Sequence, residues 1–217
     1  MNKQSQTKDF MSEGLGHKNE YSAVSGHDSM RTLPGPGLNP SAHYTLFHDA
    51  DRCIGCFACE VHCKLENEVP VGPRLMRIVQ IGPKVAAGKL KTAFVAMSCF
   101  HCQDAPCVAV CPTGAMNQRG DGLVDVNQDI CIGCKACIGG CPFGAPQYNP
   151  QSKTVIKCSY CVHRVDRGLW PSCATKCTTH CLYFGNINEI SNIIRERYSR
   201  QHSGGLATMP TGAAVTR

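Results

Sequence analysis

Short stretches of alternating apolar and polar residues run through the middle of the chain. Such alternation is typical of half-buried strands. The turn-forming pairs Asp121-Gly122 and Asn149-Pro150 stand next to two of these stretches. The pattern therefore predicts strands joined as small hairpins, at residues 75–81, 94–97, 123–126 and 154–156.

A different pattern, with apolar residues at helical spacing, lies nearer the C-terminus. Ile190, Ile193, Ile194 and Tyr198 share one face of a helix, and Asn188 is suited to cap its first turn. The spacing predicts a short amphipathic helix. We expect its apolar face to pack on the core or against a partner.

The two ends of the chain differ in composition from its middle. The N-terminal segment is polar and rich in glycine, serine and proline, and the last residues are small and polar. Such composition is typical of flexible segments. The sequence therefore predicts a flexible tail at 1–42, a folded body at 43–187, a C-terminal helix at 188–201 and a second flexible tail at 202–217.

The longest apolar run, around residues 93–100, is far shorter than the roughly 18 residues that span a bilayer. The first thirty residues contain neither a hydrophobic segment nor a twin-arginine pair. We therefore expect no direct membrane insertion and no export signal of its own. The expected location is the cytoplasm, or the membrane periphery through partner subunits; export with a signal-bearing partner stays open.

Cysteine content changes this picture most. The chain has 217 residues, of which 17 are cysteine, while aromatic residues make up only 6%. A chain of this length usually buries branched and aromatic side chains, so something besides apolar packing must stabilise it. Without an export signal the cysteines are expected as thiols or thiolates, which favours metal binding over disulfides.

Sixteen cysteines fall into four groups of four with similar internal spacing, so the body is built from a repeat. A proline follows the last cysteine of the second and third groups. Numbered along the chain, the groups are Cys53, Cys56, Cys59 and Cys63; Cys99, Cys102, Cys107 and Cys111; Cys131, Cys134, Cys137 and Cys141; and Cys158, Cys161, Cys173 and Cys177.

This spacing has a direct consequence for metal binding. Three cysteines on one tight loop reach only three corners of a cubane cluster. In two-cluster ferredoxins the last cysteine of each run binds the other cluster. Spacing alone leaves the exchange partners open, because groups one with two and three with four would satisfy it too. Sixteen ligands in four sets predict four [4Fe–4S] clusters.

Two other interpretations are less favourable. A zinc-organised interaction module needs only two separated cysteine pairs, which leaves half of each group without a role. The formal net charge of +6 suggests nucleic acid, but it counts every cysteine as neutral. Sixteen thiolates at about −16 with four cores of about +2 each would bring the net charge to about −2. We therefore expect no nucleic-acid partner.

Several motifs closely resemble the four-cluster electron-transfer subunits of molybdopterin oxidoreductases, such as the iron–sulfur subunits of dimethyl sulfoxide, polysulfide and formate enzymes. The resemblance covers about residues 43–187. The motifs that carry it are Cys99-Phe100-His101-Cys102-Gln103-Asp104-Ala105-Pro106-Cys107, Cys111-Pro112-Thr113-Gly114-Ala115, Cys141-Pro142-Phe143-Gly144-Ala145-Pro146, Lys157-Cys158-Ser159-Tyr160-Cys161 and Pro171-Ser172-Cys173.

The resemblance implies an α+β polyferredoxin made of two pseudo-symmetric bacterial-ferredoxin-like modules. Groups two and three would form one module, and groups one and four would enclose it as the second. All sixteen positions are cysteine, so no three-iron centre is expected. The implied ligand sets are Cys53, Cys56, Cys59 and Cys177 (set 1); Cys99, Cys102, Cys107 and Cys141 (set 2); Cys131, Cys134, Cys137 and Cys111 (set 3); and Cys158, Cys161, Cys173 and Cys63 (set 4).

The function implied by the resemblance is single-electron relay without catalysis. One partner would be a molybdenum or tungsten pterin catalytic subunit, and the other a quinone-reactive membrane subunit or a soluble redox carrier. An alternative places the chain in a hydrogenase, aldehyde oxidoreductase or aromatic-ring reductase complex. An autonomous iron–sulfur enzyme is disfavoured because sixteen cysteines leave no open iron site.

The chain departs from the family pattern after Cys177, where Thr178-Thr179-His180-Cys181 replaces the usual Pro-Thr-Gly-Ala. We expect Cys181 to be a small buried thiol beside a cluster; an alternative ligand or redox-sensitive thiol is the other interpretation. His101, His163 and His180 are expected as hydrogen-bond partners rather than ligands.

Five cations stand beside the cysteine groups. A nearby cation would favour the reduced cluster and raise its potential, whereas a solvated face is the alternative. These residues are Lys64, Lys135, Lys157, Arg164 and Arg167. Trp170 is expected to serve in packing.

Overall fold

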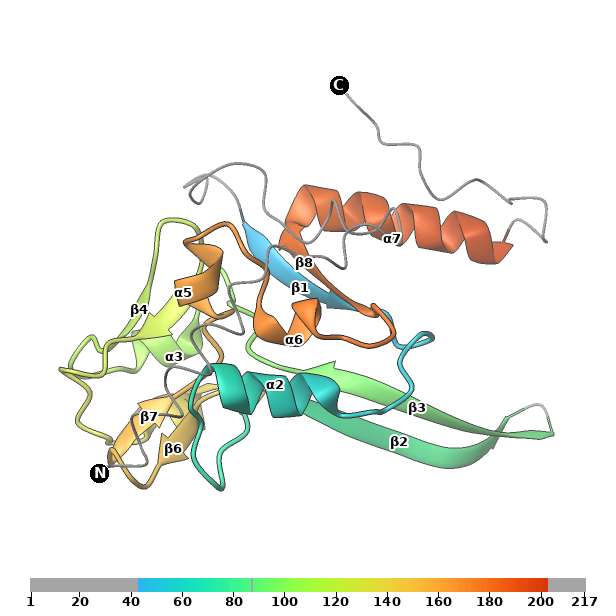
Figure 1. Cartoon of the computed structure of the whole chain (residues 1–217). Coiled ribbons are helices and arrows are strands. Elements are labelled where there is room, and N and C mark those ends of the chain that lie inside the picture. The colour runs from blue at the N-terminus through green and yellow to red at the C-terminus, as the bar shows by residue number, and fades with distance from the viewer. Residues whose placement is uncertain (1–42, 87, 203–217) are drawn as a thin grey trace, which may run out of the picture.

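The computed structural model of the chain describes residues 43–86 and 88–202. The predicted tail at 1–42, and all but the first residue of the tail at 202–217, lie outside the described residues. Within them the chain forms six helices and four two-stranded antiparallel sheets (Figure 1). This mixture agrees with the expected α+β class.

The first and last strands of the body pair with each other. β1 (Tyr44–His48) and β8 (Leu182–Asn186) run antiparallel, and the backbone N–H of Asp49 donates to the carbonyl oxygen of Cys181 just beyond them. Tyr44 stacks on Phe184 with ring centroids 5.7 Å apart. This sheet joins the two ends of the body, and the alternation pattern indicates neither of its strands.

The longest hairpin extends away from the rest of the body (Figure 1). It consists of β2 (Arg77–Ala86) and β3 (Lys89–Met97), with an irregularity between Ile81 and Lys84. The predicted strands at 75–81 and 94–97 are therefore confirmed but too short. Both strands continue as an exposed ribbon whose composition no longer alternates.

Two small hairpins stand at the opposite end of the body. β4 (Met116–Gln118) pairs with β5 (Val124–Val126), and β6 (Gln147–Asn149) pairs with β7 (Thr154–Ile156). Both hairpins confirm the predictions at 123–126 and 154–156. Their turns contain the Asp121-Gly122 and Asn149-Pro150 pairs that predicted them.

Five of the helices are short and lie in the cysteine groups. Four of them follow directly on a loop that carries the first two cysteines of a group, whereas α6 follows the turn after α5. The helices are α2 (Ala58–Glu66), α3 (Pro106–Ala109), α4 (Ala136–Gly140), α5 (Val162–Val165) and α6 (Ser172–Thr175).

The predicted C-terminal helix is present as α7 (Ile187–His202). Its cap is Asn186 rather than Asn188: the Asn186 side chain accepts the Asn188 N–H at 3.0 Å, and Glu189 accepts the Asn186 N–H at 3.3 Å. This reciprocal arrangement is a capping box, which the Asn-x-x-Glu spacing could have identified.

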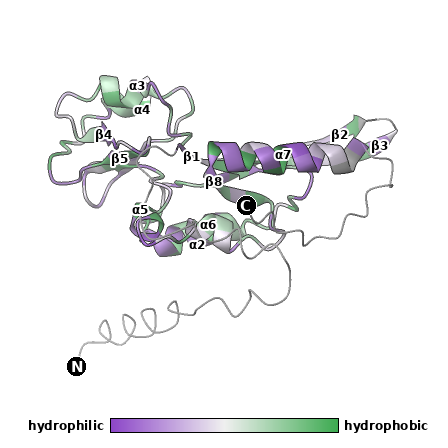
Figure 2. Cartoon of the chain, turned by 90° about the horizontal axis from the view of Figure 1, so that it is seen from above, coloured by the Kyte–Doolittle hydropathy of each residue, from purple (hydrophilic) through white to green (hydrophobic). Residues whose placement is uncertain are grey.

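The apolar face of α7 is only partly used. Ile190 is buried and Ile193 packs against the core, whereas Ile194 and Tyr198 are largely exposed. Figure 2 shows hydrophilic and hydrophobic residues alternating along this helix. The expected packing on the core is therefore confirmed for the N-terminal half of the stripe alone.

Two hydrophobic cores are present in the described residues. The larger one surrounds groups one and four and includes Tyr160, Trp170 and Phe184; the smaller one lies between groups two and three and includes Met116 and Val124. Cysteines of the groups belong to both cores. This explains how a chain with so few aromatic residues can close its interior.

Candidate metal centres

All 17 cysteines lie in the described residues, and none of them forms a disulfide. In every group the third cysteine is the second residue of a short helix, and the fourth cysteine stands one turn later. The third cysteines are Cys59 in α2, Cys107 in α3, Cys137 in α4 and Cys173 in α6. The sequence repeat is therefore also a repeat of local structure.

Left-handed residues shape the loops in front of these helices. Gly55 and Phe57 of group one have φ of 66° and 59°, and Gly133 and Lys135 of group three have 65° and 66°. A Cβ on Gly133 would stand 2.1 Å from the carbonyl oxygen of Lys153. Glycine is therefore required there both by its backbone conformation and by lack of space.

Three cavities are lined by cysteines of two groups at once. Each combines the first three cysteines of one group with the last cysteine of another. The first is lined by Cys53, Cys56, Cys59 and Cys177, the second by Cys99, Cys102, Cys107 and Cys141, and the third by Cys131, Cys134, Cys137 and Cys111. These combinations are sets 1, 2 and 3.

The members of set 4 also lie together. The side-chain nitrogen of Asn67 is 3.8 Å from Sγ of Cys63 and 3.5 Å from Sγ of Cys161. Burial raises the pKa of Cys63, and the charges of Cys158 and Cys161 add to this effect. Burial followed by the charges of Cys161, Cys158 and Cys63 raises the pKa of Cys173.

These arrangements disfavour ionised sulfur unless a cation is present. Burial and the neighbouring Cys177 raise the pKa of Cys59 to about 12, and burial and Cys161 do the same for Cys158. Converging thiolates repel one another, so a bound cationic core is needed to hold four of them. The donor sets therefore fit a thiolate-ligated metal cluster.

Backbone N–H groups point at several of these sulfurs. Met116 donates to Sγ of Cys111 at 3.4 Å, and Val155 donates to Sγ of Cys131 at 3.5 Å. Burial opposes ionisation of Cys111, but the hydrogen bonds from Met116 and Thr113 outweigh it and lower the pKa of this thiol. Hydrogen bonds of this kind stabilise ligand thiolates and tune cluster potentials.

The structure distinguishes among the five cations. Lys135 is exposed over the Tyr148 ring, Lys64 donates to a backbone carbonyl, and Arg164 pairs with Glu66. Lys157 alone of the five is buried, with 5% relative exposure. Its Nζ donates to the carbonyl oxygens of Val124 and Cys158.

Lys157 also lines the cavity of set 2 and immediately precedes Cys158 of set 4. Among the described residues no carboxylate forms an ion pair with it within 4.0 Å. A buried cation without a carboxylate partner requires negative charge nearby. Thiolates of two sets are the anions in reach. Sequence position could not separate this lysine from the exposed ones.

The three histidines differ in their surroundings. His101 is buried, accepts the Val124 N–H through Nδ1 at 2.9 Å and stacks on Tyr160. Burial, followed by the charge of Lys157, lowers the pKa of His101 well below its ordinary value. His163 pairs with Glu66 at 2.9 Å near the surface. Both are hydrogen-bond partners, as expected. His180 is half-buried in the loop before β8.

Three residues that contact sulfur were not predicted from the sequence. Asn67 reaches set 4 from the end of α2, and Thr113 and Thr179 place hydroxyls 3.8 and 3.9 Å from Sγ of Cys111 and Cys177. The threonines share a signal, because each stands two residues after the last cysteine of its group. Asn67 carries no such signal.

The chain was also compared with known proteins. Two regions match families described as 4Fe-4S dicluster domain, over residues 90–187 and 48–115. Protein NrfC of Escherichia coli K12 is 36% identical over 203 residues, covering 91% of this chain and 89% of the relative. This match reaches into the terminal segments that lie outside the resemblance at 43–187.

Two further relatives carry descriptive names. The thiosulfate reductase electron transfer subunit PhsB of Salmonella typhi is 43% identical over 67% of this chain and 77% of the relative. A polysulfide reductase chain from Wolinella succinogenes is 36% identical over 77% of this chain and 91% of the relative.

The fold and the matched domains define a ferredoxin-like 4Fe–4S protein. More particularly, this chain therefore belongs to the family of iron–sulfur electron-transfer subunits of molybdopterin oxidoreductases. The class of function expected from the sequence, electron relay within a reductase complex, is thereby confirmed. Across residues 43–86 and 88–202, none of the helices has the length and hydrophobicity to span a bilayer.

Proposed function

We propose that this chain holds four [4Fe–4S] clusters, one in each of sets 1 to 4. The observation that carries the proposal is the lining of the three cavities, each with three cysteines of one group and the last of another. The side-chain nitrogen of Asn67, which lies 3.8 Å from Sγ of Cys63 and 3.5 Å from Sγ of Cys161, supports the same exchange for set 4. The pairing of groups two with three, and one with four, follows from these sets.

When bound, each cluster accepts and releases one electron. The chain's residues supply ligands, N–H donors to sulfur and buried side chains such as Tyr160 and Trp170 that exclude water from set 4. All sixteen ligands are cysteine, so no iron is left open to a substrate. We therefore propose that the chain itself is non-catalytic.

We further propose that the body consists of two pseudo-symmetric modules. One contains groups two and three around the smaller core, and the other contains groups one and four around the larger core. The shared position of the third cysteine in its helix supports the likeness of the two modules. So do the matching left-handed residues of groups one and three.

The proposed catalytic partner is a molybdenum or tungsten pterin subunit. At the other end of the relay we propose a quinone-reactive membrane subunit or a soluble redox carrier, with membrane attachment only through such a partner. Relatives named as subunits of thiosulfate and polysulfide reductases support this assignment. A hydrogenase, aldehyde oxidoreductase or aromatic-ring reductase complex is the second candidate.

Affinity purification of the full chain from its native cells, without oxygen, tests the partner. The proposal predicts a copurifying large subunit that contains molybdenum or tungsten and pterin in about a 1:1 ratio to the chain. Nickel would instead identify a hydrogenase complex, and flavin without pterin would identify a pterin-free reductase complex. Zinc without iron in the chain would contradict electron transfer altogether.

A further inference from the structure

The cavity of set 1 has a fifth cysteine in its wall. Cys181 stands four residues after Cys177, and their Sγ atoms are 3.4 Å apart. Both line the cavity together with Cys53, Cys56 and Cys59. Set 1 therefore offers one more cysteine sulfur than a [4Fe–4S] cluster has iron atoms.

Two other groups show what normally occupies this position. Cys111 and Cys141 are followed four residues later by Ala115 and Ala145. The surroundings are otherwise alike, because a threonine hydroxyl lies 3.8 Å from Sγ of Cys111 and 3.9 Å from Sγ of Cys177. At Cys181 a thiol thus replaces a methyl group beside a ligand sulfur.

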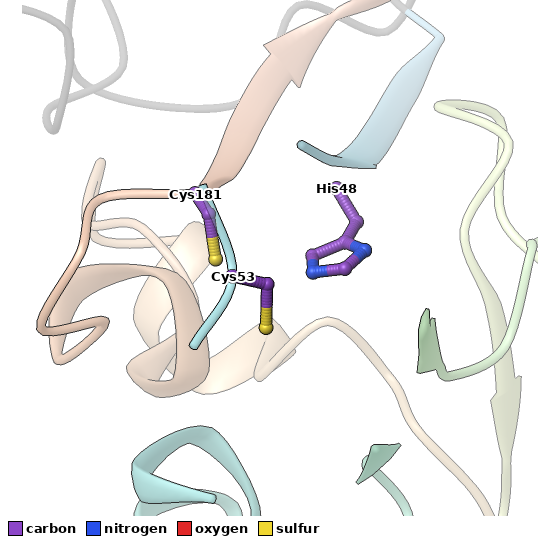
Figure 3. A group of neighbouring side chains, drawn as sticks. All are labelled: His48, Cys53 and Cys181. Atoms are coloured by element: carbon purple, nitrogen blue, oxygen red, sulfur yellow. The ribbon is translucent and has the colours of Figure 1, made fainter. Parts of the chain in front are cut away.

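The side chain of His48 also lines the cavity of set 1. His48 accepts the Ala96 N–H through Nδ1 at 3.3 Å, so the ring proton is on Nε2. That Nε2 is buried and has no hydrogen-bond partner among the described residues. A ring nitrogen of His48 and the sulfurs of Cys53 and Cys181 lie within 4.8 Å of one another (Figure 3).

Figure 3 shows the imidazole turning one nitrogen toward Cys53. A buried N–H donor that lacks a protein partner requires an acceptor. Sulfur held on a metal cluster is such an acceptor. Cys181 is a buried thiol, as expected, but it shares the wall of this cavity with an imidazole N–H that has no partner among the described residues.

We propose that Cys177 and Cys181 are alternative ligands for the same iron of the set 1 cluster, an inference that rests on the proposed function. In the exchange, the bond from iron to Sγ of Cys177 breaks and a bond to Sγ of Cys181 forms. The thiol proton of Cys181 passes to Cys177. No electron is gained or lost, and no other reactant takes part.

Cys177 is the resident ligand of this pair. It accepts the backbone N–H of Cys181 at 3.3 Å, as a ligand thiolate does. Cys181 is the reserve, which keeps the fourth iron in place when Cys177 is lost or modified. Set 1 is thereby protected against conversion to a three-iron centre.

Four variants of the full chain test this proposal: C177A, C181A, C177A/C181A and, as the matched control, C141A, which has Ala145 at the reserve position. Each is purified without oxygen in thiol-free buffer. Wild type, C177A and C181A are expected to carry about 16 iron per chain. C141A and the double variant should have about 15 or fewer, with the paramagnetic signal of an oxidised three-iron cluster.

Loss of iron from C177A to the level of C141A would overturn the proposal. So would retention of the full iron content by the double variant, because neither sulfur would then be needed. Wild type with fewer than about 16 iron would instead contradict the proposed function itself. Failure of the alternative-ligand proposal can therefore be distinguished from failure of the proposed function.

A second measurement does not depend on the folding of C177A. Ferricyanide oxidation of wild type and C181A is followed by the growth of the three-iron signal. Without the reserve ligand, C181A should form the three-iron cluster of set 1 several-fold faster. Equal rates in the two proteins would contradict the proposal.

Discussion

Sets 3 and 4 have related spacing but very different depth in the molecule. All four cysteines of set 4 are buried, whereas in set 3 Cys137 is buried, Cys111 and Cys131 are half-buried, and Cys134 is exposed. Set 4 is enclosed by the larger core, while set 3 lies beside the small hairpins. The same ligand pattern can therefore serve as an internal relay or as a contact point with a partner.

Depth changes how negative charge is stabilised. Water reaches set 3, and the N–H groups of Met116 and Val155 add to its effect. In set 4 the side chains of Asn67 and the buried Lys157 lie close by, and backbone N–H groups of Met76, Tyr160 and Ser172 also donate to its sulfurs. Charge in a buried site must be compensated by the protein itself. Set 4 should therefore depend far more on individual neighbouring side chains.

Removal of iron should reveal the largest difference between the smaller core, beside set 3, and the larger core, around set 4. Without metal the buried part of the smaller core is reduced to Met116, Val124 and Val155 besides its cysteines, whereas the larger core keeps β1–β8 and its aromatic residues. Amide hydrogen exchange should therefore lose protection in β5 by about 100-fold or more, and less in β8. Equal loss in both strands would show that the two cores do not differ in their dependence on metal.

Substitution of Lys157 should produce the next largest effect. K157M removes the buried cation beside sets 2 and 4. Loss of this positive charge disfavours the reduced, more negative clusters. The potentials of these two clusters should fall by about 60 mV or more, equivalent to a tenfold change in the reduction equilibrium. Redox titration followed by electron paramagnetic resonance measures the shift.

K135M is the matched control for this experiment, because Lys135 is exposed and lies next to set 3. It should leave all potentials nearly unchanged, and K157R should restore most of the wild-type values. A shift in K135M as large as that in K157M would mean that depth does not govern the effect of a cation.

Breaking the ion pair between the β4–β5 hairpin and α5 should have the smallest effect of these changes, and it should act on stability. Arg119, beyond β4, pairs with Asp166 at the end of α5 at 2.9 Å and with the buried Asp121 at 3.1 Å. D166N should lower the free energy of unfolding by about 0.5–1 kcal/mol. R119M should cost about 1–3 kcal/mol because it leaves Asp121 buried without its partner. Anaerobic urea unfolding measures both, and a larger cost for D166N would contradict this ranking.

The sequence predicts those features that depend on local pattern. Cysteine spacing identifies all sixteen proposed ligands, and the turn signals near Gly122 and Pro150 locate both small hairpins. In each case the residues that determine the structure are near neighbours along the chain. Local geometry such as the loop–helix repeat is therefore accessible without coordinates.

Features that depend on distant contacts are not predicted. β1 and β8 pair across more than a hundred residues, and neither strand alternates clearly. The burial of Lys157 depends on the carbonyl of Val124, and Asn67 reaches Cys161 from another group. His48 joins Cys53 and Cys181 only because β1 lies against β8. Tertiary packing creates each of these relations.

The most direct test of the account is the iron and acid-labile sulfide content of the full chain purified without oxygen. Four cubane clusters in sets 1 to 4 predict about 16 iron and about 16 sulfide per chain. Zinc in place of iron without sulfide, or a content near about 8 of each, would contradict the assignment of four clusters to these cysteines.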